Sequence, residues 1–209
     1  MKIYLIRHGK TKGNMQKRYV GRTDEGLCSS GVAEIKCLRE RYEHCIGKPS
    51  QIVTSTMRRC VETGEILFPE ARQLFVDEFK ECDFGEFEYK NYRELTGNPY
   101  YEEWIESGGS IDFPGGESKH EFQERVVDRF RELLVGGRLK LESIEDKNGG
   151  ANQAGLVFVV HGGTIMSILD RFSEPHKDYY DWQVENGHGY MGDLVVDGQK
   201  VMIKNIVKL

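Results

Sequence analysis

The sequence predicts an α/β fold, a three-layer α/β/α sandwich around a mostly parallel central sheet. Short apolar runs alternate along the chain with stretches whose apolar residues recur at helical spacing, and this alternation is typical of strand–helix–strand units. The 209 residues are 38% hydrophobic, which is enough for one sizeable core. We therefore expect a single domain over residues 1–209.

The first half of the chain alternates between predicted strands and helices. In order, these elements are strand Ile3–Ile6, helix Ser29–Cys45, strand Gln51–Thr54, helix Met57–Phe68 and strand Gln73–Asp77. The first helix should bury one face, because Ile35, Leu38, Tyr42 and Cys45 recur at the period of an α-helix. Pro69 should end the second helix, because proline cannot continue it.

Two helices of the second half have capping signals. Asn98 precedes Pro99, a pattern typical of an N-cap followed by the first helical residue, and it predicts a helix to about Glu106. Ser118 and Glu121 have the spacing of a capping box, which predicts a helix to about Leu134. The apolar stripe of that second helix is Phe122, Val126, Phe130 and Leu133.

The remaining elements are strands, one further helix and a loop. The most apolar run, Gly155–Val160, predicts a central strand, and a helix follows over Gly163–Phe172. Asp197-Gly198 lies between two short apolar runs, which predicts a hairpin and an antiparallel end to the sheet. Segment 136–154 is polar and rich in glycine, so we expect a long surface loop or insertion there.

Composition and charge exclude several classes of function. The net charge of −5 argues against a surface that binds nucleic acid. Apolar runs are shorter than the roughly 20 residues of a membrane helix. The run after Met1 is too short for a signal peptide, so we expect a cytoplasmic protein. The spacing of the cysteines fits neither a metal site nor a CxxC motif. We therefore expect reduced thiols, buried or half-buried, at Cys28, Cys37, Cys45, Cys60 and Cys82.

Chemically active side chains follow four of the predicted strands. Arg7 and His8 follow the first strand, and Arg59 comes shortly after the second. Glu81 follows the third strand, and His161 follows the apolar central strand. Because ligand sites of such sheets form beyond the carboxyl ends of parallel strands, we expect these five side chains to meet in one pocket.

These side chains suit a phosphoryl group. Guanidinium forks bind its oxygens, a neutral imidazole can attack phosphorus, and a carboxylic acid can protonate the leaving alkoxide. Backbone at Gly162 and the helix after it can approach an anion closely. We expect neither a metal nor a cofactor. Considered alone, each of these residues could have a purely structural role. A histidine at a strand end can be structural, Arg59 can lie on a solvated helix face, and Glu81 can be an ordinary loop carboxylate.

The segments that contain these residues resemble a known family, the histidine phosphatase superfamily with its phosphoglycerate mutase-like fold. The matching segments are LIRHGKTKGN (5–14), GRTDEGLCSSG (21–31), TSTMRRCVET (54–63), ECDFGEFEY (81–89), PGGES (114–118) and VVHGGTI (159–165). The resemblance implies His8 as phosphate acceptor, Glu81 as proton donor, and Arg7, Arg59 and His161 as phosphate ligands. It further implies phosphate or substrate contacts from Asn14, Arg22, Thr23 and Gly162.

Departures from the family pattern narrow the expected activity. In the mutases of this family an arginine is usual at the position of Cys82. The absence of that arginine favours a phosphatase over a mutase. Glu88 matches a second acid, and Tyr89 stands where glycine is common in the following turn. Length and the GRTDEGL segment look most like the α-ribazole phosphatase group. We therefore expect a phosphomonoesterase whose partner is a small phosphorylated metabolite, and we allow for a homodimer.

Two other functions stay open at this stage. One is a cofactor-dependent phosphoglycerate mutase, and the other is a non-catalytic module that binds phosphate esters. The presence of both histidines, both arginines and the glutamate argues against the module.

The role of one further segment is also open. The resemblance makes residues 89–117 a lid over the pocket. Within it, Tyr100, Tyr101 and Trp104 either face the pocket or anchor the lid to the core. His188 is equally undecided.

Overall fold

The computed structural model describes residues 1–137, 139 and 155–209, and it has the predicted alternation of strands and helices. The strands are β1 (Lys2–Arg7), β2 (Gln51–Ser55), β3 (Arg72–Val76), β4 (Gly155–Val160), β5 (Ser173–Glu174), β6 (Gly189–Asp197) and β7 (Lys200–Lys208). The α-helices are α1 (Lys12–Met15), α2 (Ser29–Ile46), α3 (Arg58–Leu67), α4 (Tyr92–Leu95), α5 (Pro99–Glu106), α6 (Lys119–Val135) and α7 (Gly162–Phe172). Three 3-10 turns are η1 (Asp77–Phe79), η2 (Gly85–Phe87) and η3 (Tyr179–Trp182).

One sheet contains all of these strands, in the order β3-β2-β4-β1-β6-β7-β5. Neighbours from β3 to β1 run parallel, whereas β6 pairs antiparallel with both β1 and β7. The apolar run Gly155–Val160 is a central strand, as predicted, because β4 lies between β2 and β1. The predicted hairpin is confirmed, with Asp197 paired to Lys200 across the turn.

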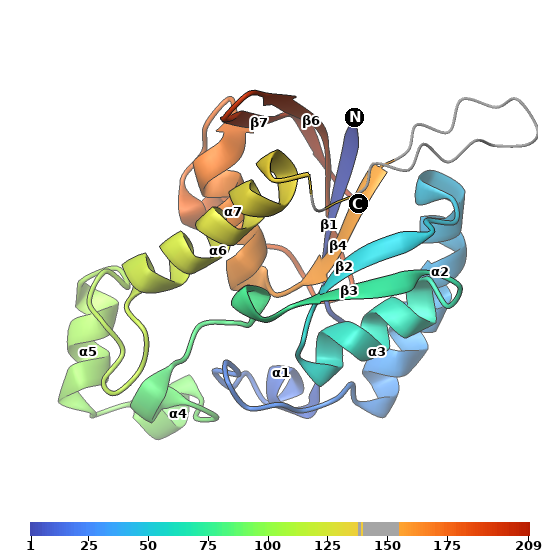
Figure 1. The fold of residues 1–209 in the computed structure, drawn as a ribbon. Helices are drawn as coiled ribbons and strands as arrows, with labels where there is room; N and C mark the ends of the chain where they lie inside the picture. Colours follow the sequence, from blue (N-terminus) through green and yellow to red (C-terminus); the bar gives the residue numbers. More distant parts are fainter. Residues whose placement is uncertain (138, 140–154) are drawn as a thin grey trace, which may run out of the picture.

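Helices cover both faces of the sheet, and the result is the predicted three-layer arrangement. In Figure 1, α2 and α3 lie on one side of the strands and α6 and α7 on the other. Side chains of β1 alternate between the two cores, as expected for a strand. Tyr4 and Ile6 pack with α2 and α3, whereas Ile3 and Leu5 belong to the core under α6 and α7.

The predicted helix caps are confirmed, but one predicted apolar stripe is only partly correct. Asn98 caps α5, and Ser118 and Glu121 form the capping box of α6. The stripe of α6 is buried throughout. On α2, however, Cys45 is exposed, and its neighbour Ile46 packs against the core that contains Tyr42.

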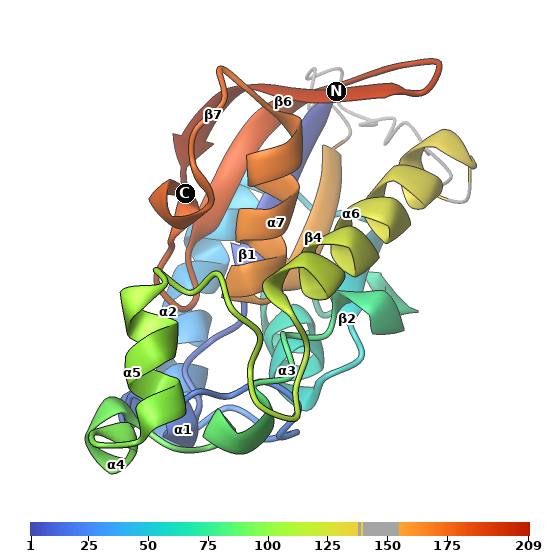
Figure 2. The same ribbon diagram turned by 90° about the vertical axis from the view of Figure 1, so that its left-hand side faces the viewer.

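The sequence did not indicate the shortest elements. α1 and α4 have four residues each, too few for a periodic signal, and each is held by its own capping box. In Figure 2, α1, α4 and α5 gather at one end of the molecule, beyond the lower ends of β1 and β4. The predicted surface loop 136–154 lies mostly outside the described residues.

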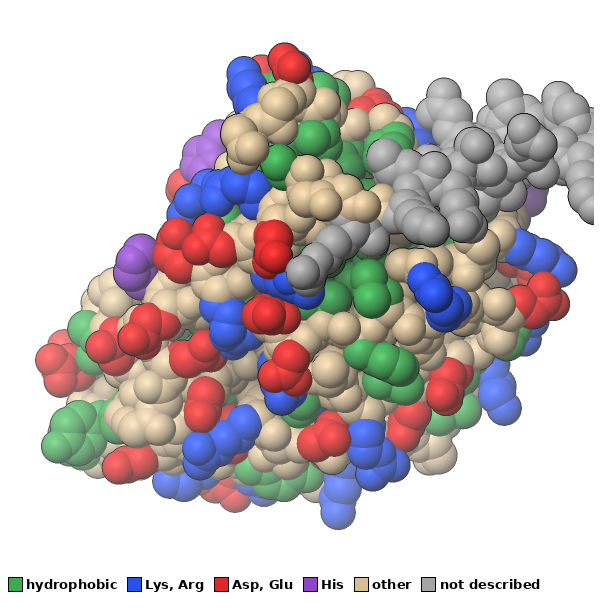
Figure 3. Space-filling model, viewed as in Figure 1, with side chains coloured by type: hydrophobic (Ala, Val, Ile, Leu, Met, Phe, Trp, Pro, Cys, Tyr) green, Lys and Arg blue, Asp and Glu red, His purple; other side chains and the backbone are tan. Residues whose placement is uncertain are grey.

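The structure can be compared with what the composition predicted about thiols, surface charge and membrane helices. All five cysteines are free thiols; Cys60 and Cys82 are buried and Cys28 is half-buried, but Cys37 and Cys45 are exposed, contrary to expectation. Over the described part of the face in Figure 3, acidic and basic side chains intermingle. Within the described residues, no helix combines the length and hydropathy that a bilayer crossing requires.

Candidate active site

His8 follows β1 and is held with one ring nitrogen free. Its backbone N–H donates to the Val160 carbonyl (3.0 Å), so the residue is fixed against the end of β4. Its Nδ1 lies 2.7 Å from the Gly9 carbonyl oxygen, which can only accept a hydrogen bond. Nδ1 therefore carries the proton, and Nε2 has a lone pair. The side chain is buried, with 3% of the residue exposed.

His161 faces His8 from the end of β4. The ring centroids are 5.2 Å apart and the rings meet edge to face. His161 is the N-cap residue of α7, and its Nε2 lies 2.9 Å from the Ser55 hydroxyl. Arg59 donates from Nε to His161 Nδ1 (3.3 Å), so the proton of His161 is on Nε2. Parallel β1 and β4 thus bring together the two predicted histidines.

Two arginines surround the histidine pair. Arg59 is fully buried on α3, and its terminal nitrogens donate to the backbone carbonyls of Thr23 and Gly21 (2.9 Å each). Arg7 donates from Nη1 to the Val184 carbonyl (2.7 Å), and its buried Nε has no hydrogen-bond partner within the described part of the chain. No carboxylate forms an ion pair with Arg59 among the described residues. A buried cation without a counter-ion favours binding of an anion.

Burial and the arginines determine the charge of both imidazoles. Burial lowers the pKa of His8 well below its ordinary value, and Arg59 and Arg7 lower it further. The pKa of His161 is lowered in the same way by burial, then by Arg59 and by His8. Both rings are therefore neutral near pH 7, and a neutral imidazole is the nucleophilic form.

Glu81 reaches the same region from the segment after η1. Its Oε2 accepts a hydrogen bond from the Gly163 backbone N–H (3.1 Å), and its Oε1 accepts one from the Cys82 backbone N–H (3.1 Å). A Cβ on Gly163 would lie 2.2 Å from Oε1, so the second glycine after His161 is required for this approach. The N-terminus of α7 thereby holds the carboxylate in place.

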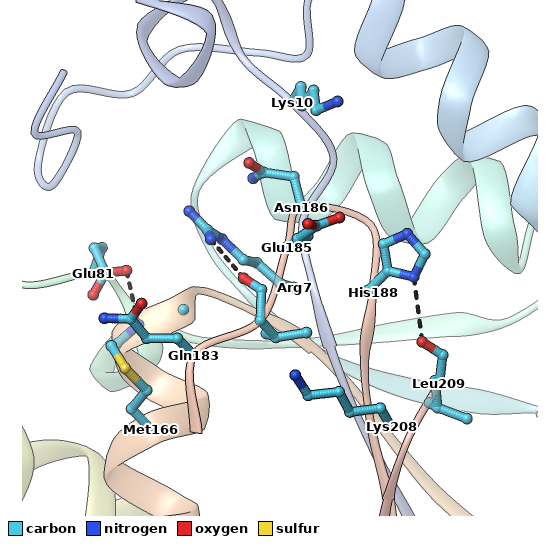
Figure 4. A pocket seen from close by; sticks show the side chains of 13 residues that line it. Arg7, Lys10, Glu81, Met166, Gln183, Glu185, Asn186, His188, Lys208 and Leu209 are labelled. Carbon is cyan, nitrogen blue, oxygen red and sulfur yellow. Dashed lines mark hydrogen bonds between the residues drawn. The ribbon is translucent and has the colours of Figure 1, made fainter. Parts of the chain in front are cut away.

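A cavity of about 990 Å³ adjoins this cluster, and Figure 4 shows its side chains. The predicted residues Arg7, Glu81 and Gly162 line it, whereas His8, His161 and Arg59 are buried and do not line it. The other side chains of the lining include Lys10, Gln183, Glu185, Asn186, His188 and Lys208. His188, undecided from the sequence, therefore lines the cavity, and its Nδ1 lies 3.2 Å from the Leu209 carbonyl oxygen.

Sequence reasoning missed Asn186 as a site residue. Its Nδ2 donates to the His8 carbonyl (3.1 Å) and to Asn14 Oδ1 (3.2 Å), so it holds the backbone of His8 from the opposite end of the chain. In the sequence, His188 is the one residue of segment Asn186–Gly189 that suggests chemistry. Only the antiparallel pairing of β6 with β1 brings Asn186 to the site.

Three further predicted ligands, besides Arg59 and His161, lie outside the cavity lining. Arg22 is exposed and pairs with Asp83 (3.2 Å). Thr23 gives its carbonyl to Arg59, and Asn14 is bonded to Asn186. Thr23 and Asn14 therefore contact residues that surround the two histidines, whereas Arg22 lies on the surface.

Glu88 and Tyr89 support the loop in front of Arg59. Glu88 accepts hydrogen bonds from the N–H groups of Gly21 (3.0 Å) and Thr23 (2.9 Å), so the second acid of the motif positions this loop. Tyr89 has φ of +59°, the left-handed conformation that explains why glycine is common there. The Tyr89 hydroxyl lies 3.2 Å from Glu25 Oε2.

The three aromatic residues of segment 89–117 have different environments. Tyr101 is buried in the core, with its hydroxyl 3.1 Å from that of Tyr19. Tyr100 is 58% exposed. Trp104 is half-buried and stacks on Tyr101, with ring centroids 6.1 Å apart. In the described residues, no three His, Cys, Asp or Glu side chains group closely enough to hold a metal ion.

Comparison with known proteins gives the family. A family model for the histidine phosphatase superfamily (branch 1) matches residues 3–205. The chain belongs to this superfamily. The adenosylcobalamin/alpha-ribazole phosphatase of Salmonella typhimurium is 24% identical, over 90% of this chain and 87% of its own length. The superfamily assignment and this relative support an enzyme of the phosphatase or mutase type.

Solved structures of other proteins share the fold. The alpha-ribazole phosphatase from Shigella flexneri has a TM-score of 0.77 at 19% identity, covering 97% of this chain and 94% of that one. The phosphoglycerate mutase from Thermus thermophilus has a TM-score of 0.66 at 27% identity, covering 100% and 98%. The fold of this histidine phosphatase superfamily member is thus phosphoglycerate mutase-like.

Proposed function

We propose that the protein is a metal-independent phosphomonoesterase that hydrolyses a small phosphorylated metabolite through a phosphohistidine at His8. One observation carries the proposal: a neutral His8, with Nε2 free, lies beside the buried Arg59 and the half-buried Arg7 and faces His161. This combination offers a nucleophile and a positively charged site for the phosphoryl oxygens in one place.

The first step transfers the phosphoryl group to the enzyme. Nε2 of His8 attacks phosphorus, the bond from phosphorus to the ester oxygen breaks, and Glu81 gives its proton to the leaving alkoxide. The Gly9 carbonyl keeps the proton on Nδ1 of His8 throughout, so the ring can stabilise the positive charge it acquires. Arg7 and Arg59 offset the negative charge of the phosphoryl oxygens, and His161 can donate a hydrogen bond from Nε2 to one of them.

The second step releases phosphate. Glu81, now a carboxylate, takes a proton from water, and the water oxygen attacks phosphorus. The bond between phosphorus and Nε2 breaks, which returns His8 to its neutral form. The position of Glu81, held by Gly163 and Cys82, allows the same carboxyl group to act in both steps.

A phosphoglycerate mutase is the second candidate, because the Thermus structure of that name covers the whole chain. Cys82 argues against it: it is buried and neutral, since burial raises the pKa of its thiol, and it cannot bind a carboxylate as an arginine would. Incubation with 2-phosphoglycerate and a bisphosphate distinguishes the two candidates. Net release of inorganic phosphate supports the phosphatase, whereas conversion to 3-phosphoglycerate supports the mutase.

The direct test of the proposal uses p-nitrophenyl phosphate with EDTA present. We expect turnover to persist in EDTA, vanadate to inhibit it, and His8→Ala to lose nearly all of it while keeping its melting temperature. Rapid alkaline quenching should trap phosphate on His8, since phosphohistidine survives alkali. Wild-type kcat in His8→Ala, or activity that EDTA removes and magnesium or zinc restores, would show the mechanism to be wrong.

A further inference from the structure

A second cavity, of about 330 Å³, begins at the proton donor. Its lining shares Glu81, Gly163, Met166 and Gln183 with the larger cavity described above. Its volume lies within the range of small-molecule sites, roughly 300–1,000 Å³. From Glu81 it extends between the lid and η3, away from Lys10, His188 and Lys208, which line only the larger cavity.

Half of the residues that line this second cavity are aromatic. The rings come from four separate parts of the chain and include Tyr19, Phe84, Trp104, Phe113, Tyr179 and Tyr180. Several of them contact one another edge to face, for example Phe84 and Phe113 with centroids 5.0 Å apart. Such contacts keep the rings in defined orientations, so the wall can hold a flat ring without reorganising.

Two residues of this wall have a polar group that forms neither a hydrogen bond nor an ion pair within the described part of the chain. Nε1 of Trp104 is buried and has no hydrogen-bond acceptor among the described residues. Lys119 Nζ lies over the rings of Tyr179 (4.6 Å) and Tyr180 (4.7 Å) and forms no ion pair within the described part of the chain. A buried N–H donor is costly to leave unpaired, and an unpaired cation in an aromatic wall attracts an anion.

We propose that this second cavity binds the alcohol part of the substrate, and that this part is an aromatic ring with a hydrogen-bond acceptor and a negatively charged substituent. The proposal rests on the proposed function, which places the ester oxygen at Glu81. Because the second cavity adjoins Glu81, a group attached through that oxygen can extend past Glu81 into it. The ring packs against Trp104 and Phe113, its acceptor meets the indole N–H, and its anionic group meets Lys119.

Trp104 also stabilises the lid, so the test needs a variant that keeps the ring. Trp104→Phe retains an aromatic side chain against Tyr101 and Phe113 but removes the N–H donor. Lys119→Met keeps the length of the side chain and removes its charge. Tyr100→Ala is the matched control, because Tyr100 is on the same helix as Trp104, is 58% exposed and does not line the cavity.

The experiment compares three esters whose leaving alcohols need a proton to similar degrees: glycerol 3-phosphate, benzyl phosphate and 4-carboxybenzyl phosphate. We expect the wild-type kcat/KM to rise in that order. Trp104→Ala should lower kcat/KM for both benzyl esters by roughly 5- to 150-fold, the effect of losing one stacked ring, with little change for glycerol 3-phosphate. Trp104→Phe should lose less, and Lys119→Met should remove about 2- to 5-fold, only for the carboxylated ester.

Binding of two phosphonates, measured by calorimetry, separates this proposal from the proposed function, because neither ligand is hydrolysed. Benzylphosphonate should bind the wild type and Tyr100→Ala more tightly than methylphosphonate does, and Trp104→Ala should lose that difference. Equal affinity of the two phosphonates would overturn the ring site, even for an active phosphatase. A preference for benzylphosphonate without turnover of any ester would instead contradict the proposed function and leave the ring site standing.

Discussion

At the residue scale, the chemistry depends on which nitrogen of each imidazole has a proton. The Gly9 carbonyl keeps the proton of His8 on Nδ1, and the Arg59 side chain leaves His161 protonated at Nε2. Neither assignment needs a carboxylate, because each neighbour can act only as an acceptor or only as a donor. With both imidazoles neutral, Arg7 and Arg59 give the site a net positive charge that a bound anion would balance.

The role of Glu81 can be tested by varying the leaving group. A general acid contributes typically about 10²- to 10⁴-fold to the rate. Glu81→Gln should lose that much on alkyl phosphates, whose alkoxide must be protonated, and far less on p-nitrophenyl phosphate, whose phenolate leaves readily. Steady-state kinetics on both substrates checks this.

Asp83→Asn is the control for Glu81→Gln. Asp83 is two residues from Glu81, but its carboxylate accepts from Gly85 and pairs with Arg22. Its substitution should leave the difference between the substrates unchanged. Equal losses of Glu81→Gln on both substrate types would assign the acid to another residue.

At the scale of the elements, Thr63 connects the end of β1 to α3. Its buried hydroxyl accepts from the Gly9 N–H (3.0 Å) and donates to the Arg59 carbonyl (2.6 Å). Thr63→Val keeps the shape but leaves the Gly9 N–H buried without an acceptor. We expect the free energy of unfolding to fall by about 1–3 kcal/mol, and kcat/KM to fall because Gly9 orients His8.

Urea denaturation and activity measurements check Thr63→Val against Thr63→Ser, which keeps the hydroxyl. Thr63→Ser should stay closer to the wild type in kcat/KM. If the two variants matched each other in activity, the hydroxyl would have no part in orienting His8.

The turn after η2 has a conformation that its residue does not favour. Tyr89 has φ of +59°, where a Cβ is unfavourable. Tyr89→Gly and Tyr89→Ala both remove the ring and its contact with Glu25, so their difference isolates the backbone. Tyr89→Gly should be more stable than Tyr89→Ala by about 1 kcal/mol in urea denaturation. The reverse order would show that the turn relaxes out of this conformation when the ring is absent.

At the scale of the whole molecule, the buried histidines make stability depend on pH. Their pKa values are lowered in the folded protein, so below about pH 6.5 the unfolded chain binds more protons than the folded one. The stability that comes with neutral histidines is therefore fully present above about pH 6.5, and it is lost as the pH falls below that value. We expect the free energy of unfolding to decrease by up to roughly 1.4 kcal/mol per pH unit for each histidine.

Urea denaturation between pH 7.5 and 5.5 checks this dependence. His161→Gln should show a shallower decrease, because it removes one of the two groups. Substitution of the exposed His44 should leave the decrease unchanged. A His161→Gln protein with the wild-type slope would contradict the assignment.

The sequence alone determined the local features. Apolar runs predicted β1 to β4, periodicity and capping residues predicted α5 and α6, and Asp197-Gly198 predicted the hairpin, since each depends on neighbours a few residues apart. The approach of Arg7, His8, Arg59, Glu81 and His161 to one edge of the sheet could be expected as well, because residues after parallel strands share that edge, but only Arg7 and Glu81 of the five line the cavity. The family resemblance followed from the same segments.

Only the tertiary structure decided which of these side chains face the cavity and what else reaches them. Asn186 arrives through an antiparallel strand pair, and Trp104 and Lys119 meet at the second cavity although they belong to separate helices. Arg22, by contrast, turns to Asp83 on the surface. Such contacts depend on packing between distant segments, and a periodic pattern within one segment has no information about which distant segment will cover it.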